Sequence, residues 1–128
     1  MKLFIRGKNI ADRNYVNFNY EYRYAELPLV AILEELGAET NWTGENTVNI
    51  YINDKTYILN TEKCTLTEEN SAFNLFQVAP GAMHGVISKV VNKEFVIDSD
   101  STRLFINVVL KLKMFIDIDN KIVTISDI

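Results

Sequence analysis

Residues 27–42 read Leu-Pro-Leu-Val-Ala-Ile-Leu-Glu-Glu-Leu-Gly-Ala-Glu-Thr-Asn-Trp. The apolar side chains of this stretch recur at the i, i+3, i+4, i+7 spacing of one helix face, at Leu29, Ile32, Leu33 and Leu36. Pro28 is tolerated in the first turn of a helix, and Gly37 is a typical C-terminal stop. The stretch therefore predicts a short amphipathic helix followed by a strand that includes Trp42.

The same pattern returns near the end of the chain. When the sequence is aligned with itself, Leu29 falls on Phe105 and Trp42 falls on Ile118. The second copy predicts a helix that Ser101 or Thr102 caps. Its apolar stripe is expected at Phe105, Val108, Val109 and Leu112. Each unit, about 27–52 and 103–126, then consists of helix, strand, tight turn and strand, and we expect both units to share one sheet and one core.

Most of the remaining chain has strand patterning. Residues 17–24 alternate between apolar and polar side chains, which predicts one half-buried strand. Its apolar face carries Phe18, Tyr20, Tyr22 and Tyr24. Further strands are expected at 48–52, 55–59, 86–91, 94–98, 114–118 and 122–125, and hairpin turns at Gly7-Lys8, Asn53-Asp54, Asn92-Lys93 and Asn120-Lys121. Residues 67–76 fit either a helix or an extended segment.

These elements predict an α+β fold dominated by strands, in which an antiparallel sheet packs against two short helices. The length of 128 residues suits one domain, residues 1–128. A net charge of -4 argues against a nucleic-acid surface. The sequence contains no apolar run of the length that a signal peptide or a membrane span needs. We therefore expect no membrane insertion and a cytoplasmic protein, or a cell-surface protein if a leader was trimmed.

The first unit, residues 27–42 together with Thr47-Val48-Asn49-Ile50, resembles the repeat of the copper amine oxidase N-terminal-like domain, also called the stalk domain. The second unit is a degenerate copy, with Leu104, Lys113 and Ile118 at the positions of the proline, glycine and tryptophan. The resemblance implies an antiparallel sheet curled against helices, usually in secreted or surface proteins and appended to other domains. The copper and quinone of the oxidases belong to a separate catalytic domain, so it implies no cofactor here.

Few residues point to chemistry. Cys64 is the only cysteine, which excludes an internal disulfide framework, and it is expected to be structural. His84, the only histidine, lies in a glycine-flanked loop over residues 79–85. It is either a surface histidine of a turn or a ligand contact. Asp98 and Asp100 are expected to cap the second helix rather than bind a metal.

Two functions follow from these observations. The first is a noncatalytic protein-interaction or scaffolding module, which could also form a homodimer through its sheet edges. The alternative is a carbohydrate-binding or cell-wall-binding module. Its ligand platform would be Tyr20, Tyr22, Tyr24, Trp42 and His84, although the tyrosine stripe could equally be the inner face of a sheet. A small hydrolase using His84 and nearby acids is a third hypothesis, and no enzymatic activity is expected.

Overall fold

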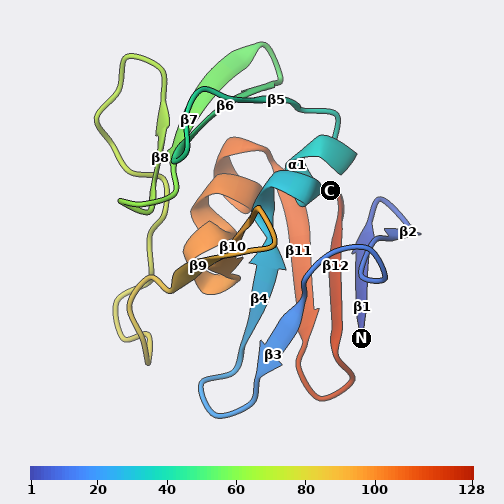
Figure 1. Cartoon of the computed structure of the whole chain (residues 1–128). Helices are drawn as coiled ribbons and strands as arrows, with labels where there is room; N and C mark the ends of the chain where they lie inside the picture. Colours follow the sequence, from blue (N-terminus) through green and yellow to red (C-terminus); the bar gives the residue numbers. More distant parts are fainter.

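The computed structural model describes residues 1–128 and shows the expected α+β fold dominated by strands (Figure 1). Its strands form three four-stranded sheets rather than one. The first sheet has the order β11-β12-β1-β2 and combines both ends of the chain. Its strands are β1 (Lys2–Ile5), β2 (Lys8–Asn9), β11 (Leu112–Asp117) and β12 (Ile122–Asp127).

The second and third sheets are entirely antiparallel. The second has the order β3-β4-β10-β9, from β3 (Asn17–Asn19), β4 (Tyr24–Pro28), β9 (Ser88–Val91) and β10 (Glu94–Asp98). The third has the order β5-β6-β7-β8, from β5 (Glu39–Trp42), β6 (Thr47–Ile52), β7 (Lys55–Asn60) and β8 (Thr65–Glu68). Residues 67–76, for which the sequence fits either a helix or an extended segment, are the end of β8 followed by a loop.

The two repeat units do not share a sheet, so that expectation is wrong. β5 and β6 of the first unit lie in the third sheet, whereas β11 and β12 of the second lie in the first sheet. The first sheet is also not purely antiparallel, because β1 pairs with β12 in parallel. No tight turn joins β1 to β12, so nothing local requires the antiparallel direction that a short hairpin imposes.

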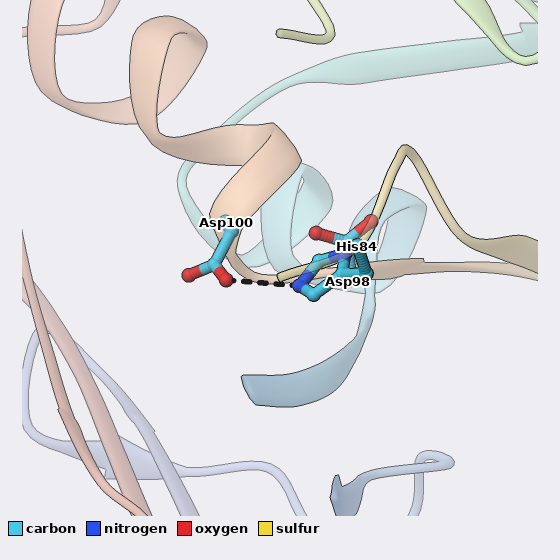
Figure 2. Close-up of side chains that lie close together, drawn as sticks. All are labelled: His84, Asp98 and Asp100. Atoms are coloured by element: carbon cyan, nitrogen blue, oxygen red, sulfur yellow. Dashed lines mark hydrogen bonds and ion pairs between the residues drawn. The ribbon is translucent and has the colours of Figure 1, made fainter. Parts of the chain in front are cut away.

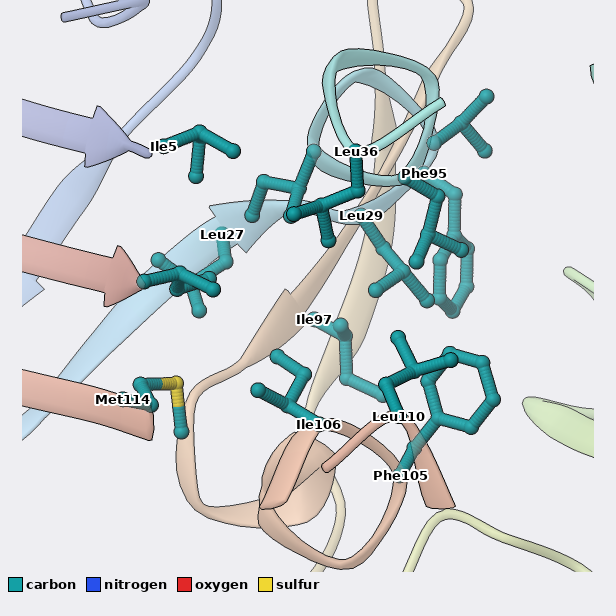
Figure 3. Close-up of a cluster of buried hydrophobic side chains, with 14 of the residues drawn as sticks. Ile5, Leu27, Leu29, Leu36, Phe95, Ile97, Phe105, Ile106, Leu110 and Met114 are labelled. Carbon is teal, nitrogen blue, oxygen red and sulfur yellow. The ribbon is translucent and has the colours of Figure 1, made fainter. Parts of the chain in front are cut away.

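One cluster of 29 buried residues draws on all three sheets. Side chains from α1 (Leu29–Glu35), β4, β10 and the C-terminal part of the chain converge in it (Figure 3). Among those drawn are Leu27, Leu29, Leu36, Phe95, Ile97, Phe105, Ile106 and Leu110. No helix of the protein has the length and apolar composition that crossing a membrane requires.

The first helix forms where it is expected, except that Pro28 ends β4 and occupies the N-cap position of the helix instead of lying in its first turn. α1 buries Leu29, Val30, Ile32 and Leu33. Gly37 has a φ of 99°, the left-handed conformation that glycine adopts without strain. The Ala38 N–H donates to the Leu33 carbonyl and the Gly37 N–H to the Glu34 carbonyl, the two bonds of a Schellman motif. The pattern of apolar residues and the glycine therefore determine both the face and the end of this helix.

The second helical segment differs from the expectation. It consists of a short 3₁₀ turn, η1 (Asp100–Thr102), and a π-helix, η2 (Leu104–Val109). The Leu110 N–H donates to the Phe105 carbonyl over 2.8 Å, a five-residue step that puts both side chains in the core. The predicted α-helical stripe is therefore wrong at Val108, which is 62% exposed, and at Leu112, which begins β11.

The predicted strand over residues 17–24 is also wrong. β3 ends at Asn19, a turn covers residues 20–23, and β4 begins at Tyr24. The Asn19 side chain accepts a hydrogen bond from the Tyr22 N–H over 2.9 Å, and Arg23 has a φ of 59°. The alternation continues in the sequence through the turn, but the two strands do not carry it on one face. Phe18 pairs with Ala25 and Asn19 with Tyr24, so Phe18 and Tyr24 lie on opposite faces of the hairpin. Asn19 was the local turn signal.

Candidate functional site

His84 lies in an irregular loop, residues 77–87, but its side chain is only 7% exposed. The imidazole packs against Tyr24 at the start of β4, with ring centroids 4.5 Å apart. Its Nδ1 is 2.6 Å from the Gly85 carbonyl oxygen, and its Nε2 is 3.0 Å from Oδ2 of Asp100 (Figure 2). His84 is therefore not a simple surface residue of a turn, because it contacts both β4 and η1.

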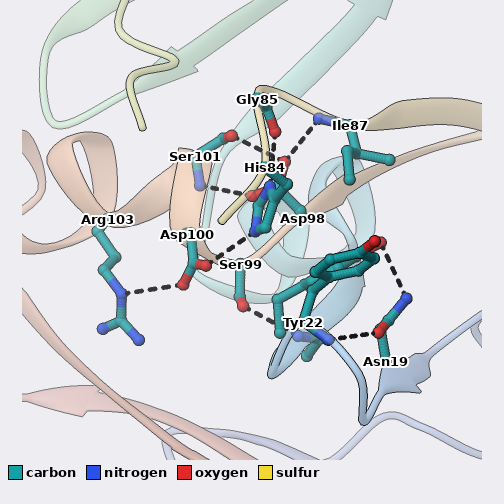
Figure 4. A network of polar contacts seen from close by, with 12 residues as sticks. Asn19, Tyr22, His84, Gly85, Ile87, Asp98, Ser99, Asp100, Ser101 and Arg103 are labelled. Atoms are coloured by element: carbon teal, nitrogen blue, oxygen red, sulfur yellow. Dashed lines mark hydrogen bonds and ion pairs between the residues drawn. The ribbon is translucent and has the colours of Figure 1, made fainter. Parts of the chain in front are cut away.

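Asp98 lies behind the histidine at the end of β10 and is completely buried. Its Oδ1 accepts the Ser101 N–H over 2.8 Å (Figure 4). Its Oδ2 accepts the Ser101 hydroxyl over 2.7 Å and the Ile87 N–H over 2.8 Å. Of the two expected caps of the second helix, Asp100 lies within η1 and faces His84, and η2 has no side-chain cap. Asp98 binds the first turn of η1 instead. It also fastens the chain that enters β9, which the sequence pattern does not show.

Asp100 carries the exposed part of this network. One carboxylate oxygen faces His84, and the other is 3.6 Å from Nε of Arg103. Burial lowers the pKa of His84, but the hydrogen bonds to Gly85 and Asp100 and the negative charges of Asp98 and Asp100 outweigh it, so the pKa is raised above 6.5.

The His84, Asp98 and Asp100 ligand atoms lie within 4.8 Å of one another, close enough to be considered as a metal site. Asp98 already accepts three hydrogen bonds, which use most of the lone-pair positions of a carboxylate. Only His84 and Asp100 keep atoms that face a shared space, and two protein ligands are fewer than a zinc site uses. The cluster is therefore a hydrogen-bonded network rather than an open set of ligands.

The same network lacks the arrangement of a hydrolase. A nucleophile needs a hydroxyl or thiol within hydrogen-bond reach of the base. The nearby hydroxyls are used elsewhere, because Ser101 donates to Asp98 and Ser99 accepts the Ala25 N–H. Cys64 interacts with Ser88, and burial raises the pKa of its thiol, which favours the unreactive protonated form. No hydroxyl or thiol is hydrogen-bonded to His84.

The structure does not gather the five residues of the expected ligand platform on one surface, and it brings Tyr24 and His84 into contact. Tyr24 is buried against His84, while Tyr20 and Tyr22 are 47% and 40% exposed in the turn between β3 and β4. Trp42 is at the end of β5 in another sheet. Because the tyrosine stripe is broken by a turn, these side chains do not form one continuous aromatic face.

Trp42 instead lines an open groove of about 470 Å³ together with residues that the sequence analysis did not single out. The other lining residues are Gly44, Glu45, Asn46, Val90 and Lys93. The groove lies between the β5–β6 turn and the β9–β10 hairpin, and Trp42 and Val90 are 39% and 56% exposed. No sequence pattern pairs these two segments, since they belong to different sheets.

Comparisons of this chain with protein-family models, curated proteins and solved structures found no match. The resemblance to the stalk domain therefore stays a prediction that rests on the repeat residues alone.

Proposed function

We propose that this chain is a noncatalytic protein-interaction module that binds its partner at the groove between Trp42 and Val90. The observation that carries the proposal is that an exposed tryptophan and an exposed valine from two different sheets line one groove. Tryptophan contributes strongly at protein interfaces because it offers a large, rigid contact area.

The strands beside the groove support a protein partner. β5 and β9 are both edge strands, so each has one side without a neighbouring strand. Such edges can hydrogen-bond an extended peptide. Glu45 and Lys93 line the groove and take part in no ion pair within the chain, which leaves one charge of each sign to be matched by the partner. A second copy of this chain is one such partner, and sedimentation velocity would detect it.

The noncatalytic part of the proposal is supported by the state of His84. Both nitrogens of the only imidazole face acceptors within the protein, and its ring packs on Tyr24. It neither lines the Trp42 groove nor contacts a nucleophile. The groove itself offers an acid, an amide and an amine but no arrangement of a base with its nucleophile.

The test immobilises the chain, incubates it with a lysate of the source organism, and measures whether one specific protein is retained. Retention is compared between the wild type and matched variants. Trp42→Ala and Val90→Ser should each abolish retention. Phe115→Ala removes another exposed aromatic side chain, on the edge strand β11 of a different sheet, and should leave retention unchanged. Equal retention by the wild type and Trp42→Ala would contradict the proposal, as would equal loss in all three variants.

Carbohydrate binding is the second candidate, favoured by the polar side chains around the indole. Glu45, Asn46 and Lys93 could hydrogen-bond sugar hydroxyls while a ring stacks on Trp42. Trp42 is the only tryptophan, so its fluorescence reports this groove alone. A saturable blue shift on titration with cell-wall oligosaccharides would establish this second function and displace the first. An unchanged spectrum would exclude it.

A further inference from the structure

Residues 79–86 form an exposed segment that a single side chain fastens to the rest of the protein. All of them are exposed except His84. The flanking contacts are the Gln77 N–H to the Ser101 carbonyl on one side and the paired backbone and side-chain bonds between Ile87 and Asp98 on the other. Between these flanks, the contact of His84 Nε2 with Asp100 is the only polar contact that leaves the loop.

The geometry of this contact requires a second proton on the imidazole. Nδ1 faces the Gly85 carbonyl and Nε2 faces the Asp100 carboxylate, and both of these groups accept hydrogen bonds. A neutral imidazole has only one N–H, so it can satisfy only one of them. The imidazolium satisfies both, and it also places a positive charge 3.0 Å from a carboxylate oxygen.

The surroundings of the ring favour this charge. Tyr24 of β4 presents its ring, Asp98 of β10 presents a buried carboxylate, and Asp100 of η1 presents a half-buried one. Arg103 is the only cation in this network, and it lies on the far oxygen of Asp100. Two carboxylates therefore act on His84 against one guanidinium that does not touch it.

We propose that His84 is a pH-dependent clasp: the imidazolium holds residues 79–86 against β4 and η1, and loss of its proton releases them. Release separates the imidazole from Tyr24 and uncovers that buried ring together with Asp98. This inference does not depend on the proposed binding groove, because none of the groove residues belongs to the clasp.

The direction in which pH acts on the clasp follows from the raised pKa of His84. The folded, clasped state binds the proton more tightly than the released state does. The clasp is therefore fully closed below the ordinary pKa of about 6.5 and opens as the pH rises through the raised value. Between the ordinary pKa of the released histidine and the raised pKa of the closed one, the ratio of closed to open loop falls about tenfold for each pH unit.

NMR titration of the full chain tests the first half of the proposal, because His84 is the only histidine and its ring resonances need no assignment. We expect a midpoint above 6.5 in the wild type and a clearly lower one in Asp100→Asn. Asp119→Asn is the matched control, since Asp119 forms an exposed ion pair with Arg23. An ordinary or lowered wild-type midpoint would overturn the clasp, as would an equal shift in the control.

Hydrogen exchange of the loop tests the second half. After correction for the intrinsic pH dependence of exchange, the amide of Ala82, which donates to the Ala79 carbonyl within the loop, should lose protection over the pH range in which His84 titrates, whereas the flanking amide of Ile87, bound to Asp98, should keep it. In Asp100→Asn and His84→Gln the protection of Ala82 should be low at every pH, while Trp42 fluorescence confirms that the variants are folded. Protection of Ala82 that does not follow the titration would refute the proposal. So would abolition of the titration by one equivalent of Zn²⁺, which would show that the space beside Nε2 holds a metal.

Discussion

Glu94 provides the sharpest test of how the tertiary structure completes the first helix. α1 has no side-chain cap of its own, since Pro28 stands at the capping position. Oε1 of Glu94, from β10, instead accepts the Val30 N–H over 2.9 Å and the Ala31 N–H over 3.4 Å. Glu94→Ala leaves the N–H of buried Val30 without this acceptor. We expect a loss of about 2 kcal/mol in the free energy of unfolding, between the cost of a missing cap and that of a buried unpaired donor.

The negative charge of Glu94 destabilises the folded protein, whereas its oxygen stabilises α1 as a hydrogen-bond acceptor. Burial raises the pKa of its carboxyl, with a further contribution from the charge of Glu34, despite the lowering effect of the helix N–H groups. The stability that the protonated carboxyl provides is therefore present below its ordinary pKa of 4.5 and is lost as the pH rises through the raised value. Glu94→Gln keeps an acceptor oxygen without this charge, so it should change the stability by less than about 1 kcal/mol at pH 7.

Thermal unfolding measured by circular dichroism separates these effects. For a chain of 128 residues, a loss of 2 kcal/mol lowers the Tm by about 7 °C. We expect this shift for Glu94→Ala and a much smaller one for Glu94→Gln at pH 7. Equal destabilisation by both variants would refute the reasoning, because it would show that the charge of Glu94, and not its acceptor geometry, stabilises α1.

Three further outcomes follow from the structure. Asp98→Ala leaves two backbone N–H groups and a hydroxyl without their acceptor, and it should lower the free energy of unfolding by about 3 kcal/mol or more in urea titrations. A small loss would show that water replaces the carboxylate. Phe105→Ala should cost about 3–5 kcal/mol and Val108→Ala less than about 0.5 kcal/mol in the same assay, and comparable losses would contradict the π-helical register. Cys64 should react slowly with a thiol reagent at pH 7 and faster as the pH rises, since its partial burial raises the pKa of the thiol, and rapid reaction at pH 7 would contradict the raised pKa.

The parts of the fold that sequence predicted are those that local geometry decides. The helix at Leu29–Glu35 was predicted from its apolar spacing and its terminal glycine. The turns Asn53-Asp54 and Asn92-Lys93 each have positive φ at both residues, the conformation of a tight hairpin turn. The strand at Glu94–Asp98 was predicted with its observed bounds.

The candidate site was predictable only in part. The glycine-flanked loop singled out His84. Its contacts with Tyr24 and Asp100 could not be predicted, because these residues are distant from it in the sequence and only the fold brings them together. The groove beside Trp42 was not predicted, because Val90 and Lys93 come from another sheet. The prediction of one aromatic face was wrong because residues 20–23 form a turn and the hairpin register puts Phe18 and Tyr24 on opposite faces.

By itself the sequence determined the helix at Leu29–Glu35, the strand at Glu94–Asp98 and the tight turns at Asn53-Asp54 and Asn92-Lys93, because hydrophobic period and positive-φ preferences act over a few residues. Only the tertiary structure decided that the strands form three sheets, that β1 runs parallel to β12, and that Glu94 caps α1. It also decided that Leu104–Val109 adopts π-helical geometry, which brings both Phe105 and Leu110 into the core. These features depend on contacts between distant residues, whose free energy arises from shared burial and pairing that no local pattern encodes.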